Sequence, residues 1–256
     1  MNKTTETKNK RVKYIANLPN DFDFPRDKIG KRLLAEYGAL FVATGGAMPP
    51  KCVIFKNEAE VSKFQSDLKK SKIIIGEFKL ELQTAAMNAL KKAIAEAAGK
   101  NLTITPRGAD AAKRIYADTV DLWASRVNPA LAHWTKEGKL KDADAARILN
   151  LSPFEQVPEI FRLESKGMFC SKDLSKSIIY SVAPPGTSQH LSMLALDVNE
   201  HNDENVRDVL ANHFWFQTVV SDLPHFTFLG IPENDLPNRG LKKISDGGRV
   251  FWLPDL

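Results

Sequence analysis

Cysteine and histidine are scarce in this chain of 256 residues, which contains two cysteines and five histidines. Cys52 and Cys170 stand far apart in the sequence, so they permit one disulfide and exclude a metal site built on closely spaced cysteine pairs. The redox state of the two thiols stays open at this level. A metal site in this chain would have to draw on histidine and carboxylate side chains.

Long hydrophobic runs and one-sided charge are also missing. No apolar run reaches membrane-spanning length, and the N-terminal MNKTTETKNKRVKY lacks the apolar core of a signal peptide. The net charge of +5 is too small to indicate nucleic-acid binding, and the lysines are not interleaved with aromatic residues as in RNA-binding sheets. We therefore expect a soluble protein without a transmembrane segment and without a nucleic-acid partner.

The order of apolar patterns predicts an α+β fold. Helical spacing is seen in 58–69, 80–98 and 110–134, the last interrupted near Pro129, and 135–165 forms a charged helical insertion. From Ile178 onward, strand patterns dominate and predict an antiparallel sheet with helices packed on one face. A further short strand is expected at 102–105. Residues 1–75 are expected to form an N-terminal extension that packs on a domain of residues 76–256.

Two short segments near the C-terminus concentrate metal-ligating residues. In PPGTSQHLSMLALDV, His190 follows a Pro-Pro-Gly turn, and Asp197 lies in an apolar run whose period of two places it on the face opposite Leu196. In DLPHFTFLG, Asp222 precedes His225 by three positions. His190, Asp197 and His225 provide the three protein ligands of a catalytic zinc site.

These motifs resemble the zinc D-alanyl-D-alanine carboxypeptidases of the VanY-like group, the LAS peptidases of M15 type. The family pattern S-x-H-x-x-G-x-A-x-D is met at Ser188, His190, Ala195 and Asp197, with Met193 in place of glycine. The family pattern E-x-W-H becomes Asp222-Leu223-Pro224-His225, followed by an aromatic strand that ends at Gly230. A weaker match covers Pro106-Arg107-Gly108 between two helices.

The resemblance implies roles for these residues. His190, Asp197 and His225 would bind Zn2+, and Asp222 would act as the general base toward a metal-activated water. Arg107 would hold the terminal carboxylate of the substrate, with Arg114 as the rival candidate. Ser188 would contact substrate or close the turn after Gly186. Two histidines and a carboxylate also suit ferrous iron, and the resemblance is what favours zinc.

The function implied is hydrolysis of bacterial cell-wall peptides, with release of a terminal D-alanine from a peptidoglycan stem peptide. One alternative is a metal-stabilised cell-wall-binding protein that is weakly active or inert, because Asp222 is one methylene shorter than the family's glutamate. Another is an amidase or endopeptidase that cuts within cross-links. The expected location is periplasmic or extracellular, with the export signal absent from this sequence; a cytoplasmic recycling role stays open. The insertion 135–165 would be a substrate lid or a partner surface.

Overall fold

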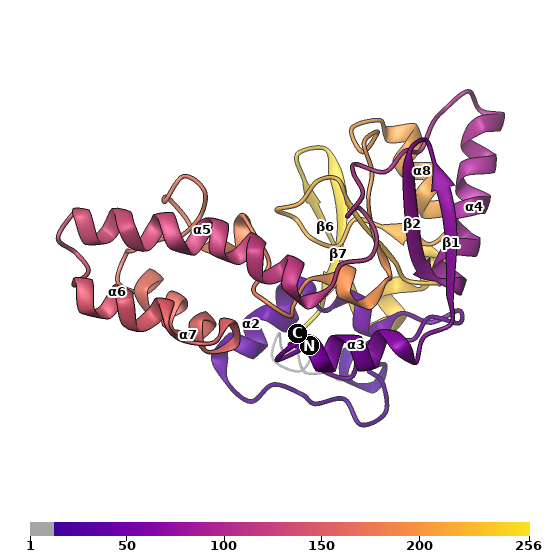
Figure 1. The fold of residues 1–256 in the computed structure, drawn as a ribbon. Coiled ribbons are helices and arrows are strands. Elements are labelled where there is room, and N and C mark those ends of the chain that lie inside the picture. The colour runs from indigo at the N-terminus through magenta and orange to yellow at the C-terminus, as the bar shows by residue number, and fades with distance from the viewer. Residues whose placement is uncertain (1–12) are drawn as a thin grey trace. The chain divides into compact units, whose positions relative to one another are not determined.

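The computed structural model describes residues 13–256 and shows an α+β protein, as predicted (Figure 1). The described chain divides into two compact units. The first comprises 13–53, 64–114 and 189–256, and the second comprises 54–63 and 115–188. The boundary expected after residue 75 lies inside the first unit. Every residue of the two metal-ligand motifs from 189 onward belongs to the first unit as well.

The strands of the first unit form three small antiparallel sheets instead of one continuous sheet. The central sheet has the strand order β3-β5-β4. A separate two-stranded hairpin precedes these strands in the sequence, and another follows them. The strands are β1 (Lys70–Ile75) paired with β2 (Phe78–Gln83), β3 (Ala195–Asp197), β4 (Trp215–Phe216) and β5 (His225–Phe228) in the central sheet, and β6 (Leu241–Asp246) paired with β7 (Arg249–Pro254).

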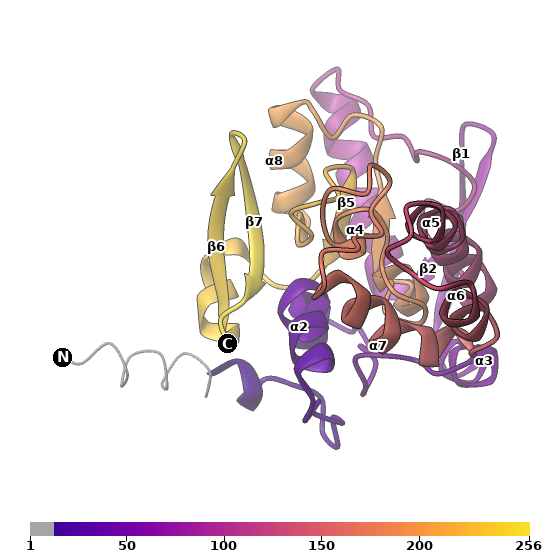
Figure 2. The ribbon, with the colours of Figure 1, turned by 90° about the vertical axis from the view of Figure 1, so that its left-hand side faces the viewer.

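The helices of the first unit pack against these sheets. Helix α4 lies beside α8 and contacts the β1-β2 hairpin (Figure 1), whereas α2 contacts β7 (Figure 2). The carboxylate of Asp27 caps α2 by accepting hydrogen bonds from two backbone N–H groups of its first turn. The elements are α2 (Lys28–Tyr37), α4 (Thr84–Gly99) and α8 (Glu204–Asn212), with 3-10 helices η1 (Gly38–Val42), η3 (Gln189–Ser192) and η4 (Glu233–Arg239).

Strand β5 is buried along its whole length, and the chain just after its C-terminal end is held by a close backbone contact of Gly230 with Thr44. Gly230 has a positive φ of 71°. A Cβ at this position would lie 2.1 Å from the carbonyl oxygen of Thr44, so only glycine fits. The adjacent Leu229 carbonyl accepts a hydrogen bond from Thr44 N at 2.9 Å. The strand that carries His225 is therefore held against the 44–45 turn.

The second unit is helical. Helices α5 and α6 lie side by side, as do α6 and α7 (Figure 1). Ser152 and Glu155 form a reciprocal capping box at the start of α7. Asn57 caps α3 by accepting a hydrogen bond from Glu60 N at 3.0 Å. The elements are α5 (Tyr116–Lys136), α6 (Asp142–Leu149), α7 (Pro153–Glu164) and the 3-10 helix η2 (Ile178–Tyr180), while α3 (Glu58–Ser66) crosses the boundary between the units.

Helix α5 differs from its prediction, because it continues through Pro129 instead of breaking there. The neighbouring side chains of Val127, Ala130 and Leu131 are at most 1% exposed. Their burial offsets the backbone hydrogen bond that proline cannot make.

Several predicted strands are absent because their backbones bond elsewhere. In 102–105 the N–H of Thr105 donates to the Glu200 carboxylate at 2.8 Å instead of to a neighbouring strand. In 177–182 a 3-10 turn forms and Ile178 N donates to the carboxylate of Glu164. The run 216–220, part of the predicted antiparallel sheet, leaves the sheet after Phe216.

No disulfide joins Cys52 and Cys170. Within residues 13–256, no helix combines the length and the hydrophobicity needed to cross a bilayer.

Met193, which stands where the family motif has glycine, keeps a glycine-like backbone. Its φ is 59°, in the left-handed region, and its side chain is 0% exposed. Its N–H donates to the His190 carbonyl at 3.1 Å, and its carbonyl accepts from Gln83 N at 3.1 Å. The left-handed turn links the 3-10 helix that carries His190 to strand β3. A non-glycine residue in this region costs of order 1 kcal/mol, which the burial of the methionine side chain offsets.

We expect Met193→Gly to be more stable than Met193→Ala by about 0.5–1 kcal/mol, because glycine alone relieves the left-handed backbone. Both variants lose about 2–5 kcal/mol relative to the parent chain through loss of the buried side chain. Met87, 0% exposed within α4, provides the control: there glycine should be less stable than alanine by about 1 kcal/mol. Urea unfolding of the four variants measures both differences. If the glycine and alanine variants had the same order of stability at positions 193 and 87, the strain assigned to the Met193 backbone would be contradicted.

Candidate metal centre

Three sequence-distant residues converge because of how the central sheet is paired. His190 lies in η3, Asp197 is the last residue of β3, and His225 is the first residue of β5. The antiparallel register places Asp197 directly opposite His225. Directly opposed residues project from the same face of a sheet, so their side chains meet.

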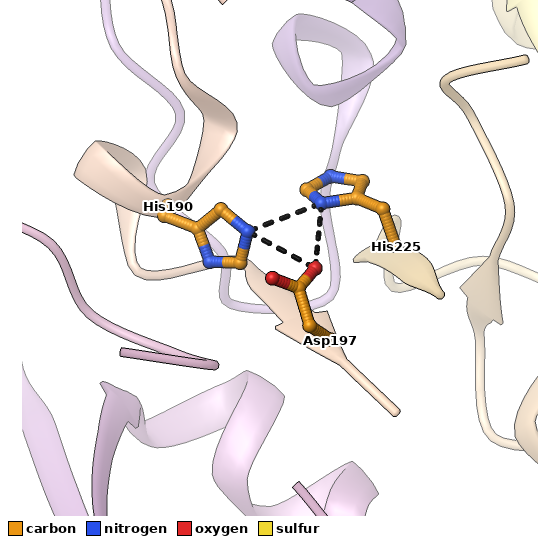
Figure 3. A group of neighbouring side chains, drawn as sticks. All are labelled: His190, Asp197 and His225. Carbon is orange, nitrogen blue, oxygen red and sulfur yellow. Dashed lines mark hydrogen bonds and ion pairs between the residues drawn. The ribbon is translucent and has the colours of Figure 1, made fainter. Parts of the chain in front are cut away.

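The three side chains form a tight triangle of potential ligand atoms (Figure 3). His190 Nε2 and His225 Nδ1 lie 3.1 Å apart, and each lies 3.2 Å from Asp197 Oδ1. All three residues are buried: His190 is 1% exposed, His225 is 3% exposed and Asp197 is 8% exposed. Four tetrahedral ligands at about 2.0–2.1 Å from a zinc ion are separated by about 3.3 Å, which is close to these distances.

The outer nitrogen of His190 is held by a backbone carbonyl. His190 Nδ1 lies 2.8 Å from the carbonyl oxygen of Ala112, which can only accept a hydrogen bond. Nδ1 therefore carries the proton of the neutral imidazole. The Nε2 atom that faces His225 and Asp197 is left as a bare acceptor, which is the form that binds a metal.

Gln189 fixes His225 in the same way. The Gln189 side-chain N–H donates to the Tyr37 carbonyl at 2.9 Å, which sets the orientation of its amide. The amide oxygen consequently faces His225 Nε2, at 2.9 Å, so this nitrogen is the donor. Thr218, at 3.2 Å, and Thr227 also donate to the same oxygen. The inner Nδ1 of His225 is therefore a bare acceptor as well.

The carboxylate of Asp197 is ionised and oriented by a guanidinium. Burial acts to raise the pKa of Asp197, but in the protonated state of the histidines their charge and hydrogen bonds outweigh burial and hold the pKa well below its usual range. Arg114 Nη2 bonds the outer oxygen Oδ2 at 3.0 Å, which leaves Oδ1 pointing at the histidines. Burial lowers the pKa of His190, which favours its neutral form.

These contacts leave three acceptor atoms facing one another without a proton among them in the neutral-histidine state. Lone pairs at 3.1–3.2 Å repel unless a cation lies between them. Two imidazole nitrogens and one carboxylate oxygen match the donor set of a zinc or ferrous site with an open position. The group can therefore bind a metal ion, and its outer contacts are those that orient metal ligands.

The backbone of segment 106–114 forms hydrogen bonds with two of the ligands, His190 and Asp197. Arg107 N donates to the Asp197 carbonyl at 3.0 Å, and Asp197 N donates to the Ala111 carbonyl at 2.8 Å. The side chain of Arg107 is exposed, whereas Arg114 is the arginine that reaches Asp197. The upstream segment singled out by sequence thus lies beside the predicted ligands.

The other two predicted site residues are placed differently. Asp222 is exposed, and its carboxylate makes no hydrogen bond or ion pair to the three ligands. Its backbone carbonyl accepts from His225 N at 3.1 Å, which holds it next to the start of β5. Ser188 is the last residue of the second unit and is partly buried.

Sequence reasoning missed Gln189 and gave Arg114 only a secondary role. Gln189 lies between Ser188 and His190 in a polar stretch of sequence, where nothing distinguishes it from its neighbours; its role shows only in its contacts with Tyr37 and His225. The acceptor role of the Ala112 carbonyl has no sequence signature, because any residue supplies a carbonyl.

Comparison with protein-family models, curated protein sequences and solved structures gave no match. The arrangement of His190, Asp197 and His225 is accordingly the main evidence about what this site does.

We expect the purified chain to bind about one zinc ion, and we expect His190→Ala and His225→Ala each to abolish binding at micromolar zinc. Metal analysis after dialysis and calorimetric titration measure both results. His133→Ala removes a histidine of the second unit and should keep full binding. Equal metal content in all four proteins would contradict the assigned ligands.

Replacing Gln189 should weaken zinc binding without removing a ligand. Gln189→Leu deletes the acceptor that fixes the His225 ring, and we expect a loss of about 10- to 100-fold in affinity.

The control is Gln156→Leu, because Gln156 belongs to the second unit and its side chain bonds the Trp123 indole N–H and the Leu151 carbonyl, none of which contacts a metal ligand. It should lower the melting temperature and leave zinc affinity unchanged. A similar loss of affinity in both variants would show that Gln189 acts only through stability.

Proposed function

We propose that this protein is a zinc-dependent peptidase that hydrolyses bacterial cell-wall peptides, as a D-alanyl-D-alanine carboxypeptidase. The observation that carries the proposal is the set of three facing acceptor atoms on His190, Asp197 and His225, each oriented by an outer hydrogen bond. The resemblance of the two motifs to the VanY-like family supplies the substrate class. The proposed location is the periplasm or the cell exterior.

The proposal assigns one role to each residue. The bound ion would act as a Lewis acid toward the scissile carbonyl and the attacking water. Asp222 would accept the proton of that water and return it to the leaving amine. Arg107, with its exposed guanidinium, would bind both oxygens of the terminal carboxylate, and Ser188 would contact the substrate.

The position of Asp222 is compatible with this role. A general base must be able to approach the attacking water, and the exposed Asp222 side chain is free of hydrogen bonds and ion pairs within residues 13–256. Its backbone link to His225 keeps it next to a ligand while the carboxylate can change rotamer.

A second candidate is a metal-stabilised cell-wall-binding protein. The lack of a hydrogen bond or ion pair between the Asp222 carboxylate and the three ligands favours it, as does the burial of the ligands. In this case the ion would stabilise the junction of β3, β5 and segment 106–114, and no proton transfer would be needed.

Asp222→Ala distinguishes these candidates. For the peptidase we expect a loss of about 10²- to 10⁴-fold in kcat on a peptide ending in D-Ala-D-Ala, with zinc content unchanged. Asp246→Ala removes another exposed aspartate, at the end of β6, and should keep full activity. Zinc-loaded parent protein without turnover would favour the binding protein.

Arg107→Ala should raise KM in a carboxypeptidase, because Arg107 would bind the terminal carboxylate of the substrate. Unchanged kinetics in this variant would favour cleavage within cross-links.

A further inference from the structure

A second polar site lies on the other face of β5. A cavity of about 200 Å³ is lined by Trp215, Phe226 and Trp252, among other residues. Phe226 follows His225 in the strand, and alternation directs its side chain to the face opposite His225 and Asp197. The cavity is therefore separate from the metal ligands.

Two arginines line this cavity and lie close to each other. Arg207 Nη1 and Arg249 Nη1 lie 3.2 Å and 2.6 Å from the same His201 carbonyl oxygen, so these nitrogens are separated by less than about 6 Å. Within residues 13–256, no carboxylate lies within ion-pair distance of either guanidinium. Two like charges at this distance repel, and both side chains are half-buried, where water screens them less than at the open surface.

The free donors of Arg207 have the geometry that binds anions. Arg207 Nη1 is used by the carbonyls of His201 and Asn202, at 3.2 and 2.9 Å. Within residues 13–256 its Nε and Nη2 have no acceptor, and these two atoms form the edge of a guanidinium that meets both oxygens of a carboxylate or phosphate. The Nε of Arg249 also has no acceptor among these residues, whereas its two terminal nitrogens bond the His201 and Asn202 oxygens.

The aromatic residues at the cavity are almost completely buried, with Trp215 0%, Phe226 1% and Trp252 4% exposed. The indole N–H groups of Trp215 and Trp252 are buried without a hydrogen-bond partner within the described chain. Glu204 and Asp208 line the same cavity, but both are exposed on α8 and are screened by water. Glu233 is paired with Lys243 at 3.5 Å, so their charges offset each other.

We propose that Arg207 and Arg249 form a binding site for a small organic anion, whose carboxylate or phosphate meets the guanidinium pair while its ring or aliphatic body lies in the cavity beside them. The site is independent of the metal centre. It would hold an effector or a second part of a larger ligand.

The test uses benzoate and phenyl phosphate as probes, with benzyl alcohol as the neutral analogue. Calorimetry and tryptophan fluorescence should show saturable binding of at least one anion and none of the alcohol. Benzoate binding alone identifies a carboxylate ligand, and phenyl phosphate binding alone identifies a phosphate ligand. No saturable binding of either anion, or equal binding of the alcohol, overturns the proposal.

Variants locate the site. Arg207→Gln should weaken binding by about 10- to 100-fold. Arg207→Lys keeps the charge and lacks the paired donors, and it should also bind more weakly. Lys242→Gln removes one positive charge from β6 outside the cavity lining and should change affinity less than twofold.

His190→Ala should bind the probes as the parent does, because it alters only the metal centre; loss of binding there would place the anion at the metal and overturn the assignment. Unchanged affinity in a folded Arg207→Gln protein, judged by circular dichroism, would also overturn it.

Discussion

Three buried hydrogen-bond acceptors meet without a donor between them, and most of the first unit is arranged to make this possible. A buried acceptor triangle of 3.1–3.2 Å is unfavourable by itself. Hydrogen bonds on the outer side of each ligand offset this cost. The Ala112 carbonyl, the Gln189 amide and the Arg114 guanidinium each bind the outer atom of one ligand. Because the outer contacts fix the protons, the inner atoms are available to a cation.

The outer contacts come from parts of the chain that are far apart in sequence. Segment 106–114 provides both the Ala112 carbonyl and Arg114, and it is joined to β3 by backbone hydrogen bonds on either side of Asp197. Gln189 is anchored to Tyr37 at the end of α2. The packing of α2 and of segment 106–114 therefore determines ring orientation in the centre. A change in this packing would alter metal affinity without touching a ligand.

The sequence was sufficient to predict what depends on local pattern. The α+β class follows from the order of apolar patterns, and His190, Asp197 and His225 were expected to meet because their residue types suit a metal and because the two motifs resemble those of a metallopeptidase family. Strand 102–105 was predicted wrongly because Glu200, far along the chain, takes the Thr105 N–H that a sheet would have used. Gln189 was missed for the same reason: its role depends on Tyr37 and His225, which no window of sequence brings together.

Strand β5 connects the two proposed sites through its two faces. His225 and Thr227 face Gln189 and the metal ligands, whereas Phe226 lines the aromatic cavity. The strand cannot slip by one residue, because a slip would exchange these faces and bury Phe226 where an imidazole is needed. Its start is fixed by the pairing of His225 with Asp197, and its end by the contact of Gly230 with Thr44. The register of β5 therefore fixes His225 at the metal centre and Phe226 at the cavity at the same time.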